Sequence, residues 1–78
     1  NYETWATNLW VTNHEGSYKA LCRLADQHKG EMTWAHARDF CEWLYGKDLK
    51  NLSDVRNPFK VDWEEIAKNF NEHHEPTP

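Results

Sequence analysis

The first thirteen residues constrain the fold most, because they place bulky side chains at helical spacing. Apolar residues recur at i, i+3, i+4, i+7 and i+8, the pattern of one broad face of an α-helix. They are Tyr2, Trp5, Ala6, Leu9 and Trp10. Each indole can bury about 150–250 Å², a large area for a small chain. We therefore expect an opening helix, capped by Asn1 and ending near Thr12, whose ring-bearing face forms the centre of the core.

The size and composition of the chain favour one helical domain. Its 78 residues are 38% hydrophobic and 14% aromatic, with three Gly and three Pro. A chain of this length is near the lower limit at which a hydrophobic core suffices, and its few Gly and Pro argue against a loop-rich β fold. We predict an all-α fold, a compact single domain of four to five short helices with an aromatic-rich core, over residues 1–72. Residues 73–78 contain no apolar anchor and are predicted to be a disordered tail.

Two further helices are predicted in the first half of the chain. One starts at the Asn13 cap and ends at Lys29-Gly30, and the other runs from the Thr33 cap to Gly46. Their expected core residues follow the helical period: Tyr18, Leu21, Cys22, Leu24 and Ala25 in the first, and Trp34, Ala37, Phe40, Cys41 and Leu44 in the second. Trp43 lies to one side of this stripe, on the line of His36 and Phe40, and Tyr45 lies on the opposite flank.

The second half of the sequence predicts two helices, the first from weak signals and the second from clear start signals. Leu49, Leu52 and Val55 are spaced for a short helix after Asp48, which the Asn57-Pro58 pair ends. The last helix begins at Asp62, where Glu65 three residues on completes a capping box and Val61 with Ile66 makes a hydrophobic staple. Its expected inner face consists of Trp63, Ile66, Ala67 and Phe70.

Neither the cysteines nor the histidines show the spacing of a metal site. Cys22 and Cys41 lie inside apolar helical patterns and are interpreted as small buried hydrophobic residues, with their pairing left open. The five histidines are His14, His28, His36, His73 and His74. Because paired zinc-ligand spacings do not occur among them, we predict no metal and no cofactor.

The sequence also argues against catalysis and against a membrane location. The acidic residues fall on predicted outer faces and caps, and no nucleophile motif or Gly-rich phosphate loop occurs. A core filled with rings leaves little room for a substrate cleft, so we expect a protein that is not an enzyme. No apolar run is long enough to span a bilayer and no secretory segment opens the chain, so we expect a cytoplasmic protein.

The acidic C-terminal segment and the large number of aromatic rings together indicate partner binding. The net charge is −4, and residues 61–78 alone contribute five acidic side chains against Lys68. An acidic end of this kind can meet a basic partner. Eleven rings exceed what a core of short helices readily encloses, and Trp and Tyr are enriched at interface hot spots. The candidate partner-binding residues are Trp10, Trp43, Tyr45, Asp62, Glu64, Glu65 and Glu72. The alternative is that the edge rings only seal the rim of the core.

Two motifs in the sequence resemble those of a protein family. The first consists of Asn1-Tyr2-Glu3-Thr4-Trp5, Leu9-Trp10, Asn13, Glu15-Gly16 and Tyr18, and the second is Val61-Asp62-Trp63-Glu64-Glu65-Ile66-Ala67. Both resemble a family of small uncharacterised proteins encoded by phages, plasmids and related mobile elements. The family has no established activity, so the resemblance implies a genomic context and a bacterial host cell rather than a chemistry. The stretch from residue 26 to residue 60 does not contribute to it.

These observations favour a non-enzymatic protein-binding factor from a phage or mobile element. Small acidic proteins of such elements often counter host defences, so the resemblance implies an inhibitor of a CRISPR effector or a restriction enzyme. The expected partner is a host defence protein or nucleoprotein complex, with no direct nucleic acid and no membrane. Two alternatives remain. One is a helix-turn-helix-like nucleic-acid-binding regulator that reads with the helix after Thr33. The other is a structural domain that forms a homodimer through its edge rings.

Overall fold

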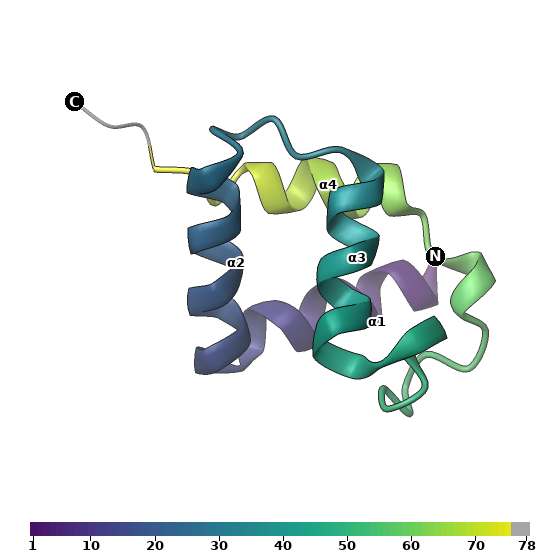
Figure 1. The fold of residues 1–78 in the computed structure, drawn as a ribbon. Coiled ribbons are helices and arrows are strands. Elements are labelled where there is room, and N and C mark those ends of the chain that lie inside the picture. Colours follow the sequence, from purple (N-terminus) through teal and green to yellow (C-terminus); the bar gives the residue numbers. More distant parts are fainter. Residues whose placement is uncertain (76–78) are drawn as a thin grey trace.

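Residues 1–75 are described by a computed structural model, and they form four α-helices and two short 3-10 helices (Figure 1). The α-helices are α1 (Tyr2–Asn13), α2 (Glu15–Gln27), α3 (Trp34–Tyr45) and α4 (Trp63–Asn71), and the 3-10 helices are η1 (Lys47–Leu49) and η2 (Pro58–Lys60). The described residues contain no strand. The predicted all-α class and helix number are confirmed.

The helices form two crossed pairs. In Figure 1, α2 and α3 run alongside each other, while α1 and α4 cross behind them near opposite ends. Helix α4 packs against α3, α1 and α2, and α1 packs against α2. The crossing helices therefore tie α2 to α3 from behind, so that the opposite side of the pair is left uncovered.

The core contains an aromatic cluster surrounded by aliphatic side chains. Phe40 of α3 and Phe70 of α4 meet edge to face, with ring centroids 6.0 Å apart, a favourable geometry for two rings. Leu21, Ile66 and Val11 are fully buried next to them. Trp10, Tyr45 and Trp63 are partly buried and pack against this cluster. The predicted aromatic-rich core is confirmed.

The predicted inner face of α1 is only partly correct, because Ala6 is buried and Trp10 packs against the core but Tyr2 and Trp5 do not. Thr4, Thr7 and Val11 face the core, whereas Tyr2 and Trp5 are each 57% exposed. Helix α1 has apolar residues on both sides, Tyr2 and Trp5 outward and Ala6 and Val11 inward, so its spacing alone does not decide which side faces inward. Burying the threonines is inexpensive because the Thr4 hydroxyl accepts the Asp62 N–H at 2.8 Å and the Thr7 hydroxyl donates to the Glu3 carbonyl at 2.8 Å.

Two other rings expected in the core lie outside it. Tyr18 is exposed, with its ring edge-on to His73 at 5.4 Å between centroids. Trp34 is also exposed, and the Arg38 guanidinium lies 5.0 Å from its ring centroid. Both residues lie in the first turn of the apolar pattern of their helices, where the neighbouring helices no longer cover them. The boundary residue between α1 and α2 is His14, not the predicted Asn13.

The segment between α3 and α4 is buried as predicted but is not an α-helix. Leu49, Leu52 and Val55 are all buried. However, Asp48 and Leu49 have positive φ angles of 53° and 56°, which an α-helix cannot contain. The 3-10 helix η1 therefore carries Leu49 into the core, and irregular backbone carries Leu52 and Val55.

The start of α4 is built differently from the predicted capping box. The Asp62 carboxylate accepts the Glu65 N–H at 3.1 Å, but the Asp62 N–H is donated to Thr4, so Glu65 has no donor to cap. A reciprocal box occurs at α3 instead, between Thr33 and His36. Val61 and Ile66 are both buried, as the hydrophobic staple requires.

The end of the described chain contacts α2. The Nδ1 atom of His74 lies 3.1 Å from the Asp26 carboxylate, and the Glu75 N–H donates to the same oxygen at 3.0 Å. The predicted disorder of residues 76–78 falls outside the described residues. In the described part of the chain, no helix has the length and apolar character that crossing a bilayer requires.

Candidate functional site

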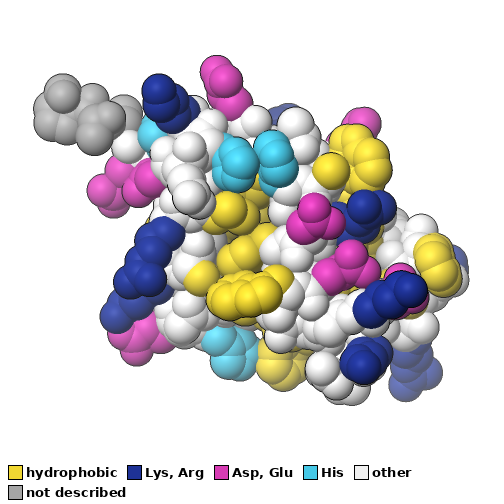
Figure 2. Space-filling model, in the orientation of Figure 1, with side chains coloured by type: hydrophobic (Ala, Val, Ile, Leu, Met, Phe, Trp, Pro, Cys, Tyr) yellow, Lys and Arg dark blue, Asp and Glu magenta, His cyan; other side chains and the backbone are white. Residues whose placement is uncertain are grey.

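A groove of about 450 Å³ lies between α2 and α3. Its floor consists of Ala20 and Leu24 from α2 and Phe40 from α3. Figure 2 shows these two helices with a band of apolar side chains between them on the uncovered side of the molecule. The groove exists because α1 and α4 close the α2–α3 pair only from behind. Its volume is in the range of sites that hold a ligand or part of a partner.

The walls of the groove combine one large ring with charges of opposite sign. Trp43 of α3 is 74% exposed, and its ring stacks on Phe40 with centroids 6.1 Å apart. Arg23 and Gln27 line the groove from α2, and Asp39 lines it from α3. An exposed indole continuous with an apolar floor is a feature of interaction sites rather than of an ordinary surface.

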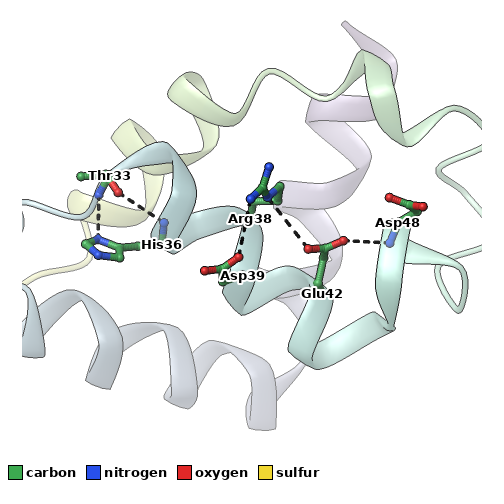
Figure 3. A network of polar contacts seen from close by, with 6 residues as sticks. All are labelled: Thr33, His36, Arg38, Asp39, Glu42 and Asp48. Atoms are coloured by element: carbon green, nitrogen blue, oxygen red, sulfur yellow. Dashed lines mark hydrogen bonds and ion pairs between the residues drawn. The ribbon is translucent and has the colours of Figure 1, made fainter.

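A histidine pair closes one end of the groove. The rings of His28 and His36 stack with their centroids 4.0 Å apart, and both line the groove. The Thr33 N–H donates to Nδ1 of His36 at 3.1 Å, so the proton of the neutral ring is on Nε2 (Figure 3). The connecting loop is held by Asn71, whose side chain accepts the Met32 N–H at 2.8 Å and donates to the Met32 carbonyl at 2.9 Å.

A second cavity, of about 410 Å³, lies on the other side of α3. Two of its charged residues, Arg38 and Glu42, make polar contacts within the protein, although Nε of Arg38 is buried without a hydrogen bond. Figure 3 shows Arg38 between Asp39 and Glu42, at 3.9 Å from each, while Glu42 also accepts the Asp48 N–H at 2.9 Å. We choose the α2–α3 groove as the candidate site because its apolar floor adjoins the exposed ring of Trp43.

The structure separates the predicted partner-binding rings. Trp43 lines the groove, whereas Trp10 lines a different cavity, donates from Nε1 to Asp54 at 2.6 Å and stacks on His14. Tyr45 is partly buried against the core, and burial raises the pKa of its phenol above the ordinary value. Of the three rings, Trp43 alone presents most of its surface to solvent.

The predicted acidic residues lie on α4, outside the groove. Glu64, Glu65 and Glu72 are exposed, and in residues 1–75 no ion pair involves them. The Asp62 carboxylate is occupied as the N-cap of α4. The acidic face and Trp43 are therefore two separate surface features.

Most of the groove residues were not among the predicted partner-binding residues. The missed residues are Ala20, Arg23, Leu24, Gln27, His28, His36, Asp39 and Phe40. A pattern that marks them does exist, since Ala20, Leu24 and His28 recur every four residues on α2. On α3, His36, Phe40 and Trp43 form the matching line. Each line joins apolar residues to a histidine, which marks the edge of a helix face rather than its centre.

The described residues do not group their titratable side chains into a metal site. In residues 1–75, no cluster of three or more His, Cys, Asp or Glu side chains is placed to hold an ion. Cys22 and Cys41 are free thiols, the first partly buried and the second fully buried. Comparison with protein-family models, curated proteins and solved structures found no match to this chain. The groove is therefore the basis for the functional argument.

Proposed function

We propose that this chain is a non-enzymatic protein-binding factor that holds its partner in the α2–α3 groove. The supporting observation is Trp43, 74% exposed beside an apolar floor. Buried aromatic anchors dominate the energy of protein interfaces, and an exposed indole in a groove is pre-positioned to become one. The unpaired acids of α4 provide a second contribution, because they attract a basic partner over a longer range.

The target we propose is a bacterial defence complex, such as a CRISPR effector or a restriction enzyme. The resemblance of Asn1-Tyr2-Glu3-Thr4-Trp5 and Val61–Ala67 to proteins of phages and plasmids supports this target class. Such complexes expose basic surfaces that hold nucleic acid, and Glu64, Glu65 and Glu72 are suited to occupy them. Direct binding of nucleic acid to the groove is disfavoured, because Asp39 stands opposite Arg23 and repels phosphate. Helices α2 and α3 also run alongside each other (Figure 1), whereas the helices of a helix-turn-helix cross at about 90–120°.

The test is capture by the purified protein from lysates of bacteria that carry CRISPR and restriction systems. Captured proteins are identified by mass spectrometry, and the complex is then rebuilt from purified components. We expect Trp43→Ser to weaken the rebuilt complex at least tenfold. Trp5→Ser is the matched control, since it removes an exposed indole that does not line the groove. Equal binding by the two variants, or no rebuilt complex, would overturn the proposal.

The defence target has its own readout. Cells that restrict a phage are made to express the wild-type protein, Trp43→Ser or Trp5→Ser. We expect phage plating to recover with the wild-type protein and with Trp5→Ser but not with Trp43→Ser. Unchanged restriction with all three proteins would remove the defence complex as the target and leave protein binding to the capture experiment.

A further inference from the structure

The α2–α3 groove has the properties of a site for one helix. We infer that its occupant is an amphipathic α-helix of a partner protein, which places an acidic side chain beside Arg23 and a basic side chain beside Asp39. This inference rests on the proposed function and specifies the chemistry of the partner. Four observations carry it: the composition of the walls, the length of the groove, the closed end and the charges on the two rims.

The walls of the groove exclude a partner that needs main-chain hydrogen bonds. Both walls are α-helices, whose backbone N–H and C=O groups are bonded within the helix except at the termini. An extended peptide that adds to a sheet edge would find no row of free main-chain donors and acceptors along these helices. A helix satisfies its own backbone and offers only side chains, so it can enter an apolar groove without leaving polar groups unpaired.

The groove has the length of two helical turns. Its lining residues run along α2 from Ala20 to the C-cap His28, and along α3 from His36 to Trp43. At 1.5 Å per residue these stretches are about 10–12 Å long. That length takes apolar residues at i, i+3 or i+4 and i+7 of a partner helix, the usual anchors of helix-in-groove recognition. The stacked His28–His36 pair closes the end near the α2–α3 loop and so limits the apolar contact to this length.

The two rims of the groove carry opposite charges that are available to a partner. In residues 1–75, no hydrogen bond or ion pair from the Arg23 side chain is present. The Asp39 side chain is 71% exposed, and its contact with Arg38 is long at 3.9 Å. Figure 2 shows side chains of both signs on each side of the apolar band, and the charged residues that line the groove itself are Arg23 on the α2 rim and Asp39 on the α3 rim. A helix with one acidic and one basic flank is complementary to both rims, and the charges then fix its direction.

The test uses three alanine-based helical peptides that share one leucine stripe and differ in their flanks. The mixed peptide has glutamates on one flank and lysines on the other, and the remaining two have all glutamates or all lysines. Binding is measured by fluorescence anisotropy, and the site is located by amide NMR shifts at Ala20, Leu24 and Phe40. We expect the mixed peptide to bind about threefold to tenfold more tightly than either single-sign peptide, since one exposed charge pair is gained and one like-charge contact is removed.

Substitution of a charged residue on the rim changes the expected order of the three peptide affinities. In Arg23→Glu both rims are acidic, so the all-lysine peptide becomes the tightest of the three. Lys68→Glu on α4 is the matched control, because it makes the same change in net charge outside the groove and leaves the mixed peptide preferred. A proline in the centre of the mixed peptide breaks its helix, and we expect it to weaken binding at least tenfold.

Several results would overturn the inference. One is an order of peptide affinities that does not change in Arg23→Glu. Another is a proline peptide that binds as tightly as the mixed peptide. A third is the absence of NMR shifts at the amides of Ala20, Leu24 and Phe40. Dimerisation of the protein that shifts the same groove amides would identify a second copy as the occupant. If no helical peptide binds although a captured target still depends on Trp43, the helical occupant is wrong and the proposed function stands. If the peptides bind in the expected order but no target is captured, the groove chemistry stands and the proposed function fails.

Discussion

At the scale of single residues, two threonines in α1 have the same burial but different partners. Thr4 accepts the Asp62 N–H from α4, whereas Thr7 donates to a carbonyl of its own helix. In Thr4→Val the Asp62 N–H loses its acceptor, and we expect the free energy of unfolding to fall by about 1–2 kcal/mol. In Thr7→Val the Glu3 carbonyl is still available to the helical backbone, so the expected change is under about 0.5 kcal/mol. Urea unfolding of the two variants measures the difference, and equal losses would contradict this account.

The buried thiol of Cys41 makes the free energy of unfolding depend on pH in alkaline solution. Burial raises the pKa of its thiol far above the ordinary value of 9.0. The unfolded thiol therefore loses its proton before the folded one, so stability is complete below pH 9 and falls as the pH rises beyond it. Between pH 8 and pH 10 we expect the wild type to lose about 1 kcal/mol more than Cys41→Ala. Urea unfolding under reducing conditions at these two pH values tests this, and parallel losses would refute it.

At the scale of elements, helix positions were predictable from the sequence but the inward face of α1 was not. The caps Asn1, Thr33 and Asp62 and the terminal Gly46 are short-range features, and each one bounds a helix in the structure. The inward face depends on long-range contacts instead. A bond from Asp62 to Thr4 makes a polar face suitable for burial, and no helical period contains that information.

The candidate site shows the same division between local and long-range information. Trp43 was singled out by its place at the edge of an apolar stripe, but that place did not decide its exposure, since Trp10 and Tyr45 were chosen on the same grounds and are partly buried. The groove itself did not follow from the sequence, because it requires two helices that are adjacent in sequence to be held apart by α1 and α4. The predicted helix after Asp48 failed for a further reason. Its three apolar residues are buried as expected, but the chain reaches them through residues with positive φ.

Two glycines within or next to helices provide a matched prediction for these elements. Gly46 ends α3 with a φ of 90°, and a Cβ there would lie 3.1 Å from the side chains of Asn51 and Lys50. Gly16 lies in the first turn of α2, where an added Cβ meets no atom within 4 Å. We expect Gly46→Ala to lower the free energy of unfolding by about 1–3 kcal/mol. We expect Gly16→Ala to raise it by about 0.4–1 kcal/mol. Shifts of the same sign in thermal or urea unfolding would contradict the assigned backbone conformations.

At the scale of the whole molecule, a negative net charge is combined with apolar surface in several places. Tyr2, Trp5, Trp43 and Phe59 are exposed, while the chain carries a net charge of −4. Net charge keeps copies of a protein apart, and its loss allows exposed apolar surface to associate. The sequence isoelectric point is near 5.6, so repulsion between copies disappears in mildly acidic solution.

This balance predicts self-association that depends on pH. By light scattering at low salt, we expect one copy at pH 7.5 and a reversible rise in average mass as the pH approaches 5.6. Trp43→Ser should reduce that rise more than Trp5→Ser, because Trp43 adjoins the apolar floor of the groove whereas Trp5 lies beside Tyr2 and outside the groove. A two-copy mass at pH 7.5 that does not change with pH would contradict this prediction. It would mean that the exposed rings serve a homodimer, and the groove would then have to be reassigned from a foreign helix to a second copy of the chain.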